Sequence, residues 1–365
     1  MTATKKIDDL FEEALAKGVF PGAVVGVASP KKDLFKKAYG LAERIPVERK
    51  TSLKTYYDIA SLTKPLGTTL VCMILTEKGL FDPDTPASKF ITPWKKEPYT
   101  RILLKHLLQH NSGLPAYKPY FELYLPKILE GQDPEEIRKA LVYRIVKENL
   151  ETDPGATKVY GDLGFILIGQ ILEKITGKPL DKLFSDLVAK PLKLEDTFFV
   201  RLGGKYKLPP RTDFASTQRC PLRRKILAGE VDDEHAWILG GVAGHAGLFS
   251  TLGDLSKIAD EILKIDEEKS KLLKKETFRR FVDAKPPMGW DVPSPQNSQA
   301  GTLFSPKETI GHLGFTGSSI WIDLARKFYV ILLTNRVHPS RYNEAIKEFR
   351  PKIHDLILQT FKLTK

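Results

Sequence analysis

A serine and a lysine three residues apart, Ser61 and Lys64, begin an apolar segment that runs to Glu77. Residues at positions i and i+3 are neighbours on a helix surface, so the lysine amine and the serine hydroxyl would lie side by side. Burial lowers the pKa of a lysine, and a neutral amine beside a serine hydroxyl can act as the general base of a serine nucleophile. The same spacing also fits a helix-capping serine followed by a lysine whose charged end reaches water.

The Ser-x-x-Lys spacing is a weak signal by itself, because the chain contains it twice. Ser29 and Lys32 have the same spacing, but they lie in a polar turn, Ser29-Pro30-Lys31-Lys32-Asp33, with no apolar helix behind it. The apolar segment after Ser61 therefore distinguishes the pair that could be buried from the pair that could not.

The tripeptide Tyr160-Gly161-Asp162 comes directly before an apolar segment that begins at Leu163. A tyrosine hydroxyl carries protons at neutral pH only if a neighbouring cation lowers its pKa from about 10. Asp162 precedes a predicted helix, so it could equally be an N-cap residue, and Tyr160 could be a packed aromatic side chain.

A third candidate is His312 with Gly314, in a segment that reads as a strand. Alternate residues of a strand face the same side, so both would face one surface of the sheet. A glycine there would let a substrate approach the backbone closely, and the histidine could orient a substrate group. The alternative is a half-buried strand histidine without a chemical role.

Other motifs are incomplete. His106 and His110 are spaced like a metal-binding pair, but the glutamate of the metalloprotease helix and a third ligand are absent, so we expect no metal. The glycines of residues 240–247 match neither phosphate-loop pattern, so we expect no cofactor. The chain also lacks the Gly-x-Ser-x-Gly elbow of α/β-hydrolases.

The elements that would position these residues form an α+β pattern of strands and a helix, a largely helical middle, and strands and a helix again. Residues 284–306, rich in proline, indicate a long surface loop that could be a lid, and residues 201–235 look irregular. The predicted helices are 5–18, 61–77, 102–110, 134–150, 163–175, 252–264 and 342–361, and the predicted strands are 19–28, 34–41, 311–323 and 327–334.

This order of elements predicts an antiparallel sheet flanked by the N- and C-terminal helices. We expect residues 1–60 and 240–365 to form the sheet domain, and residues 61–239 to form a mostly helical inserted domain. No internal repeat interrupts this layout.

The composition narrows the classes of function. The chain has 365 residues, and 57 Lys and Arg against 45 Asp and Glu give a net charge of +12, but the basic runs are short and separated by acids. A diffuse basic surface does not predict a nucleic-acid partner. We also expect no membrane span, since no run of about 18 apolar residues occurs. The two cysteines and an N-terminus without an apolar leader pattern favour a cytoplasmic protein.

Taken together, Ser-x-x-Lys, a later Tyr-x-Asp and a late His-x-Gly resemble the motifs of the penicillin-recognising serine hydrolases. This family contains the class C β-lactamases, DD-peptidases and related esterases. The flanking residues are similar too, and they extend over nearly the whole chain: Tyr57–Leu66, Leu107–Pro115, Gly241–Ser250, Gly311–Gly317 and Trp321–Asp323.

The resemblance implies that Ser61 is the acylated nucleophile and that Lys64 and Tyr160 share the proton transfer. It also implies an oxyanion hole made of the backbone N–H groups of Ser61 and Phe315. Asp162, His312 and Gly314 would contact the substrate. The fold implied by the resemblance agrees with the layout read from the elements.

Three positions depart from the family pattern. Gly161 replaces the commoner serine, Asp162 replaces the asparagine of β-lactamases, and His312 replaces the usual lysine. A charged Asp162 would raise the pKa of Lys64. Either Asp162 turns toward its helix cap, or Lys64 stays protonated and Tyr160 is the base, and the sequence leaves both open.

We therefore expect a serine hydrolase that cleaves ester or amide bonds of small substrates through an acyl-enzyme, with esterase-like character. A DD-peptidase or weak β-lactamase acting on cell-wall peptides is an alternative. A non-catalytic binding or sensor module on the same scaffold is another. The oligomeric state stays open.

Overall fold

The computed structural model describes residues 4–30, 32–204 and 207–364. Lys31 of the predicted turn, and Lys205 and Tyr206 of the predicted irregular segment, lie outside the described residues. The helices are α1 (Lys5–Ala16), α2 (Leu70–Glu77), α3 (Leu104–Leu108), α4 (Tyr120–Leu129), α5 (Pro134–Ile145), α6 (Leu163–Thr176), α7 (Leu180–Phe184), α8 (Glu234–Ile238), α9 (Leu252–Asp266), α10 (Lys275–Val282) and α11 (Ile346–Thr360). The strands are β1 (Gly22–Ser29), β2 (Lys32–Glu43), β3 (Arg49–Lys50), β4 (Tyr57–Asp58), β5 (Phe198–Phe199), β6 (Arg219–Cys220), β7 (Lys225–Ile226), β8 (Leu248–Ser250), β9 (Thr309–Leu313), β10 (Ser319–Asp323) and β11 (Phe328–Thr334).

The main sheet has six antiparallel strands in the order β3-β2-β1-β11-β10-β9. The N-terminal and C-terminal parts of the chain meet at its centre, where Val25 of β1 pairs with Leu332 of β11. These two strands are rich in valine, isoleucine and leucine and are buried along almost their whole length, as expected for strands covered on both faces. The predicted α+β fold with an antiparallel sheet is confirmed.

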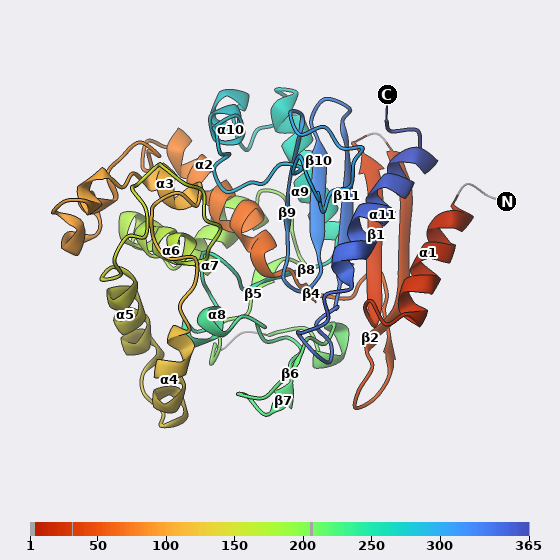
Figure 1. The fold of residues 1–365 in the computed structure, drawn as a ribbon, viewed down its shortest axis with the longest axis horizontal. Helices are drawn as coiled ribbons and strands as arrows, with labels where there is room; N and C mark the ends of the chain where they lie inside the picture. Colours follow the sequence, from red (N-terminus) through yellow and green to blue (C-terminus); the bar gives the residue numbers. More distant parts are fainter. Residues whose placement is uncertain (1–3, 31, 205–206, 365) are drawn as a thin grey trace.

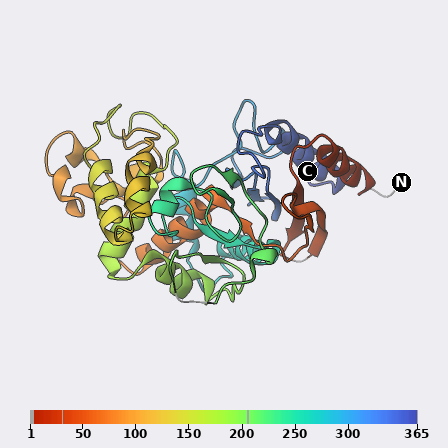
Figure 2. The same cartoon turned by 90° about the horizontal axis from the view of Figure 1, so that it is seen from below.

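Helices cover both faces of this sheet (Figure 1). On one face, α1 and α11 pack together, and Phe11 stacks on Tyr39 of β2 at 4.1 Å and meets Phe349 at 5.2 Å between ring centroids. On the other face, α9 packs against β1 and β11. Figure 2 shows the two terminal helices side by side at one end of the molecule. The sheet is therefore held rigid between two apolar layers.

The helices α3 to α7 gather on the side of α2 away from the sheet (Figure 1). Helix α2 is buried almost throughout, which agrees with its apolar sequence. None of the helices in the described part of the chain combines the length and the apolar character that crossing a bilayer requires. The proposed boundaries at residues 60 and 240 stay a prediction.

The predicted helix 61–77 is present but changes type along its length. A 3₁₀ turn covers Ala60–Leu62, a π-helical segment covers Lys64–Thr69, and α2 follows. Pro65 lies at the second position of the π-helical segment, where its missing N–H removes a donor from the helical hydrogen-bond pattern. Wider helical turns of this kind are rare and are frequent at functional sites.

Several sequence expectations needed correction. The helix predicted over 134–150 ends at Ile145, as α5. The predicted strand 311–323 is two strands, β9 and β10, separated by a tight turn at residues 314–318. The last helix begins at Ile346 rather than at residue 342, since Tyr342 is 87% exposed and lies in a loop. The predicted irregular segment 201–235 contains the short hairpin β6-β7.

The sequence analysis missed a small three-stranded sheet, β4-β8-β5. Its strands have only two or three residues each, too few for an alternating pattern to be recognised. The N–H of Ile59 donates to the carbonyl of Leu248 at 3.1 Å, and the N–H of Leu248 donates to Thr63 Oγ1 at 3.2 Å. These bonds tie β8 to both sides of the residue at position 61.

Candidate active site

Ser61 lies in the 3₁₀ turn that directly follows β4. The preceding residue, Ala60, has φ +47°, in the left-handed region that non-glycine residues seldom adopt. Asp58 Oδ1 accepts a hydrogen bond from the N–H of Ala60 at 2.8 Å, and Thr316 Oγ1 donates to the carbonyl of Asp58 at 2.8 Å. The backbone that carries Ser61 is thus fixed to the turn between β9 and β10.

The Lys64 amine joins the three side chains that the sequence singled out. Lys64 is fully buried, and its Nζ donates to Ser61 Oγ at 2.9 Å, to Tyr160 Oη at 3.0 Å and to Asp162 Oδ1 at 2.7 Å. The carbonyl of His245 lies at 3.4 Å from the same nitrogen. The Lys64 amine therefore lies within hydrogen-bond distance of the hydroxyl of nearby Ser61 and of the phenol of Tyr160, which is distant in sequence.

The charges of this cluster decide between the two alternatives for Asp162. Its side chain makes no cap hydrogen bond to α6 and instead forms the ion pair with Lys64. Burial opposes the charge of Lys64, but the charge of Asp162 and the hydrogen bonds to Asp162 and Tyr160 outweigh it and raise the pKa of Lys64. Burial likewise opposes the charge of Asp162, and the charge of Lys64 outweighs it and lowers the pKa of Asp162. Lys64 is therefore a cation at neutral pH.

Tyr160 is a phenol rather than a phenolate at neutral pH. Burial of the hydroxyl beside Lys64 raises the pKa of Tyr160, and the negative charge of Asp162 acts in the same direction. The charge of Lys64 lowers that pKa but does not outweigh the other two effects. The sequence predicts that a neighbouring cation lowers the pKa of this phenol, but burial of the hydroxyl, with the carboxylate of Asp162 adding to it, outweighs the effect of Lys64. The Tyr160 side chain is 44% exposed, so a substrate can reach it.

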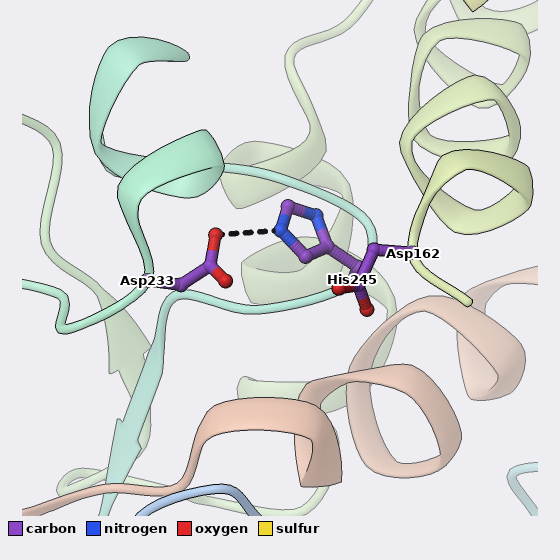
Figure 3. Close-up of side chains that lie close together, drawn as sticks. All are labelled: Asp162, Asp233 and His245. Carbon is purple, nitrogen blue, oxygen red and sulfur yellow. Dashed lines mark hydrogen bonds and ion pairs between the residues drawn. The ribbon is translucent and has the colours of Figure 1, made fainter. Parts of the chain in front are cut away.

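A second pair of polar side chains, Asp233 and His245, lies beside Asp162 (Figure 3). His245 Nε2 and Asp233 Oδ1 are 2.8 Å apart, and Asp233 also caps α8 by accepting from the N–H of Ala236. One ligand-type atom each from Asp162, Asp233 and His245 lies within 4.8 Å of the others, a set that could hold a metal ion. Because Lys64 already pairs with Asp162 at 2.7 Å, one of these carboxylates is neutralised by the protein itself. We expected no metal from the sequence, and that expectation stays a prediction.

The two histidines with the spacing of a metal-binding pair, His106 and His110, each accept a backbone hydrogen bond at a different place. His106 Nδ1 accepts from the N–H of Leu103, and His110 Nδ1 accepts from the N–H of Gly161 at 3.3 Å. Burial lowers the pKa of His110 to about 3, so this ring is neutral. Its centroid is 4.6 Å from that of Tyr160, and His110 thus supports the phenol from behind.

His312 occupies the end of β9 beside the same phenol. Its Nδ1 lies 2.8 Å from the carbonyl of Leu313, which makes Nδ1 the protonated nitrogen and leaves Nε2 as an acceptor. Burial lowers the pKa of His312, so the ring is neutral at neutral pH. The ring centroids of His312 and Tyr160 are 5.8 Å apart. A neutral acceptor at this position differs in hydrogen bonding from the lysine of the resembling family.

Two glycines of the motifs are explained by close backbone approach. A Cβ atom on Gly161 would lie 2.5 Å from the carbonyl oxygen of Ala116, so the serine found in relatives cannot fit here without movement. A Cβ atom on Gly314 would lie 2.8 Å from the carbonyl oxygen of Ile59. Gly314 therefore lets β9 approach the segment that leads to Ser61, which is a role in packing in addition to the predicted substrate contact.

These groups open into one cavity of about 530 Å³. A cavity of this size suits a small-molecule or short-peptide ligand. Both signs of charge line it. The cavity wall includes Ser61, Tyr160, Asp162, Asp233, Glu234, Asp291, His312, Gly314, Phe315, Arg336, Arg341, Lys347 and Arg350.

The sequence analysis missed several residues of this cavity. Asp233 and the arginines had no motif to mark them, because their positions follow from tertiary packing. His245 lies in the middle of Gly241–Ser250, one of the segments that resemble the family, and this position could have marked it as a candidate site residue. Asp291 belongs to the predicted surface loop 284–306, but its N–H and carbonyl pair with Gly311 at the edge of β9, so this part of the loop is a fixed wall.

Comparisons with known proteins identify the family of this chain. The family model described as Beta-lactamase matches residues 7–353, and the chain belongs to the β-lactamase family, a family of serine hydrolases. The N-acetylmuramyl-L-alanine amidase of Bacillus subtilis (strain 168) is 31% identical, over 92% of this chain and 81% of that protein. A protein of Escherichia coli (strain K12) named "Putative D-alanyl-D-alanine carboxypeptidase" is 30% identical, over 87% of this chain and 79% of its own length.

Among solved structures, the octameric penicillin-binding protein homologue from Pyrococcus abyssi is similar, with a TM-score of 0.73 and 21% identity. The match covers 99% of this chain and 78% of that one. At this identity the likeness establishes the fold.

Proposed function

We propose that this protein is a serine hydrolase that cleaves amide bonds of small cell-wall peptides, with Ser61 as the acylated nucleophile. The observation that carries the proposal is the single buried amine of Lys64 within 3.0 Å of both Ser61 Oγ and Tyr160 Oη. Nucleophilic catalysis by serine needs a partner that takes the hydroxyl proton. The hydroxyl oxygen of Tyr160 can take it, and the Lys64 cation can stabilise the charge that develops.

In acylation, Ser61 Oγ attacks the substrate carbonyl carbon. The proton of Ser61 passes to the hydroxyl oxygen of Tyr160 while the proton of Tyr160 passes to the leaving nitrogen. The Oγ–C bond forms, the C–N bond breaks, and the amine leaves neutral. Lys64 stays protonated and stabilises the negative charge that develops on the two oxygens. Deacylation reverses the relay, with water in the place of the amine.

The resemblance to the family assigns the developing oxyanion to the backbone N–H groups of Ser61 and Phe315. Within the described residues, the N–H of Phe315 has no hydrogen-bond acceptor of its own, so it is available to a ligand. Removal of one oxyanion donor typically lowers kcat by about 10²–10³. Most of the catalysis proposed here is thus electrostatic.

The proposed substrate class comes from the relatives together with the cavity. The Bacillus subtilis relative is named for an N-acetylmuramyl-L-alanine bond and the Escherichia coli relative for a D-alanyl-D-alanine bond. Both are amide bonds of cell-wall peptides. A cavity of about 530 Å³ with acidic and basic walls suits fragments that carry both an amine and a carboxylate. We therefore propose muramyl peptides and short D-alanyl peptides as the first substrates to test.

Ester hydrolysis is the second candidate, and His312 favours it. A neutral, buried imidazole is a weaker carboxylate anchor than the lysine of penicillin-binding relatives. Substrates without a carboxylate, such as short-chain esters, do not need that anchor. The same feature makes strong β-lactamase activity the weakest of the hydrolytic alternatives.

The experiment is fluorophosphonate labelling followed by a hydrolysis panel. The panel contains a muramyl dipeptide, a D-Ala-D-Ala peptide, short p-nitrophenyl esters and a chromogenic cephalosporin. We expect labelling of Ser61 that Ser61→Ala abolishes with the fold intact, and faster turnover of the amides than of the cephalosporin. Ser29→Ala is the matched control, because Ser29 and Lys32 share the spacing but lie in a turn. Labelling that survives Ser61→Ala would overturn the proposal, and an unlabelled, inactive protein would favour the binding module.

A further inference from the structure

The tight turn at residues 314–318, which connects β9 to β10, is held from behind by a buried arginine of α11. Arg350 is 5% exposed. Its Nη2 donates to the carbonyls of Gly314 at 3.1 Å and Ser318 at 3.2 Å, and its Nε donates to the carbonyl of Gly317 at 3.1 Å. A buried guanidinium is thus used to bind the carbonyls of one turn, more than 30 residues away along the chain.

The bond from Arg350 to Gly314 has a direct geometric consequence for the next residue. The carbonyl of Gly314 and the N–H of Phe315 belong to the same peptide group, which is trans. In a trans peptide the C=O and N–H point in opposite directions from one rigid plane. With the carbonyl fixed toward Arg350, the N–H of Phe315 is fixed away from it, without an acceptor among the described residues.

The positive charge of Arg350 adds an electronic effect to this orientation. Burial lowers the pKa of Arg350 to about 9, so the side chain remains charged at neutral pH. A charged donor on a carbonyl makes a stronger hydrogen bond than a neutral donor, and it polarises the peptide so that the N–H on the other side becomes a better donor. Both effects favour an oxyanion at the N–H of Phe315.

Other carbonyls of the turn also accept hydrogen bonds from side chains. These bonds hold the turn in one orientation. Arg336 Nε donates to the carbonyl of Phe315 at 2.8 Å, and its guanidinium lies 4.6 Å from the ring centroid of Phe315. Thr334 Oγ1 donates to the carbonyl of Thr316 at 3.0 Å. Arg336 therefore binds the peptide group between Phe315 and Thr316, whose N–H belongs to Thr316. Arg350 binds the peptide group between Gly314 and Phe315, whose N–H is the oxyanion donor.

We propose that Arg350 is a positioning residue of the oxyanion hole, which orients and polarises the peptide group whose N–H, at Phe315, receives the substrate oxygen. The inference rests on the proposed function, because it requires a tetrahedral oxyanion at Ser61. It assigns to α11, a helix that otherwise packs on the sheet, a direct effect on the rate of acylation.

The test compares wild type with Arg350→Met and Arg350→Lys. Arg326→Met is the matched control, because Arg326 also donates to backbone carbonyls, those of Leu303 and Leu363, but does not contact the turn. Four quantities are measured with a p-nitrophenyl ester and a boronic acid: kcat, KM, the boronate inhibition constant and the infrared carbonyl stretch of the acyl-enzyme. Mass spectrometry of wild type first establishes that the ester acylates Ser61.

We expect Arg350→Met to lower kcat by roughly 10–100-fold, somewhat less than the loss of a whole oxyanion donor. KM should change little, boronate affinity should fall by a similar factor to kcat, and the carbonyl stretch should move to higher wavenumber because its hydrogen bond is weaker. Arg350→Lys should show the same changes at smaller size. If Arg350→Met does not fold, the lysine variant decides.

The outcomes separate the inference from the proposed function. A carbonyl stretch and a boronate affinity equal to wild type in a folded Arg350 variant would overturn the inference and leave the proposed function standing. Equal effects in Arg326→Met would also overturn it, since they would show a general loss of rigidity. Wild type that is acylated at Ser61 neither by the ester nor by a substrate of the amide panel, and is not labelled there by the fluorophosphonate, would overturn both.

Discussion

Asp162→Asn should give this protein a stability that changes between pH 6 and pH 9, a pH dependence that the ion pair between Lys64 and Asp162 prevents in the wild type. The two atoms are 2.7 Å apart, and the Lys64 side chain is fully buried. At an effective dielectric constant of about 20, two unit charges at that distance attract by about 6 kcal/mol. Removing one partner of a buried pair typically costs about 3–5 kcal/mol, because an unpaired buried charge remains.

The sign follows from the two pKa shifts. The folded pKa of Lys64 is raised, so its contribution is present below its unfolded pKa of about 10.4 and is lost as pH rises through the folded pKa. The folded pKa of Asp162 is lowered, so its contribution is present above its unfolded pKa of about 3.9 and is lost as pH falls through the folded pKa. The pair therefore stabilises the fold from about pH 4 to about pH 10.

In Asp162→Asn, burial acts on Lys64 without a counter-charge and lowers its pKa. Lys64 can then lose its proton as pH rises, and the neutral amine no longer needs a partner. We expect the variant to be less stable than wild type by about 3–5 kcal/mol near pH 6, with the difference shrinking steadily toward pH 9.

The assay is urea unfolding followed by tryptophan fluorescence, at pH 6, 7.5 and 9. Asp291→Asn is the matched control: Asp291 pairs with Lys158 at 2.8 Å, but both side chains are about one-third exposed. Such a partly exposed pair contributes about 0–1 kcal/mol, so this control should show a small difference that varies little with pH. A difference for Asp162→Asn that is the same at pH 6 and pH 9, or no larger than that of the control, would refute the reasoning.

Two further changes test the surroundings of the site. Burial raises the pKa of Asp58 to about 7, so wild type should lose up to about 4 kcal/mol of unfolding free energy between pH 4 and pH 7, and Asp58→Asn should remove that slope in urea titrations. Gly161→Ser should lower the unfolding free energy by about 1–3 kcal/mol in the same assay, because the new Cβ would lie 2.5 Å from the carbonyl oxygen of Ala116. A fully stable Gly161→Ser would mean that the segment at residue 116 can move.

The sequence correctly predicted those helices and strands whose apolar pattern and end residues lie within the segment itself. The helix expected over 163–175 is observed as Leu163–Thr176 and is followed by Gly177 with φ +68°, because an apolar repeat and a glycine stop both act within the segment. The hairpin of β1 and β2 is likewise confirmed. The turn at residues 314–318 could not be predicted, since its conformation depends on Arg336 and Arg350, which come later in the chain.

The same distinction applies to the site. Ser61, Lys64 and Tyr160 could be proposed from motif order, and the structure brings their polar atoms together. Asp233 could not be proposed from the sequence, because no motif marks it. The tertiary fold of residues 227–233 and its hydrogen bond to His245 place it in the site. The catalytic roles assigned to these residues stay predictions until the labelling is done.

Asp162 determines the protonation state of the Lys64 amine in this site. An asparagine at that position would leave the buried amine of Lys64 free to lose its proton, and the amine could then act as the base itself. A carboxylate fixes the amine as a cation, and burial together with that carboxylate raises the pKa of the phenol, so neither group begins as a free base. In the proposed mechanism, the proton of Ser61 therefore moves through Tyr160 to the leaving group in a single relay. A leaving group that accepts a proton readily, as an amide nitrogen does once the carbonyl becomes tetrahedral, suits this relay. The aspartate thus links the charge state of the site to the amide substrates proposed for it.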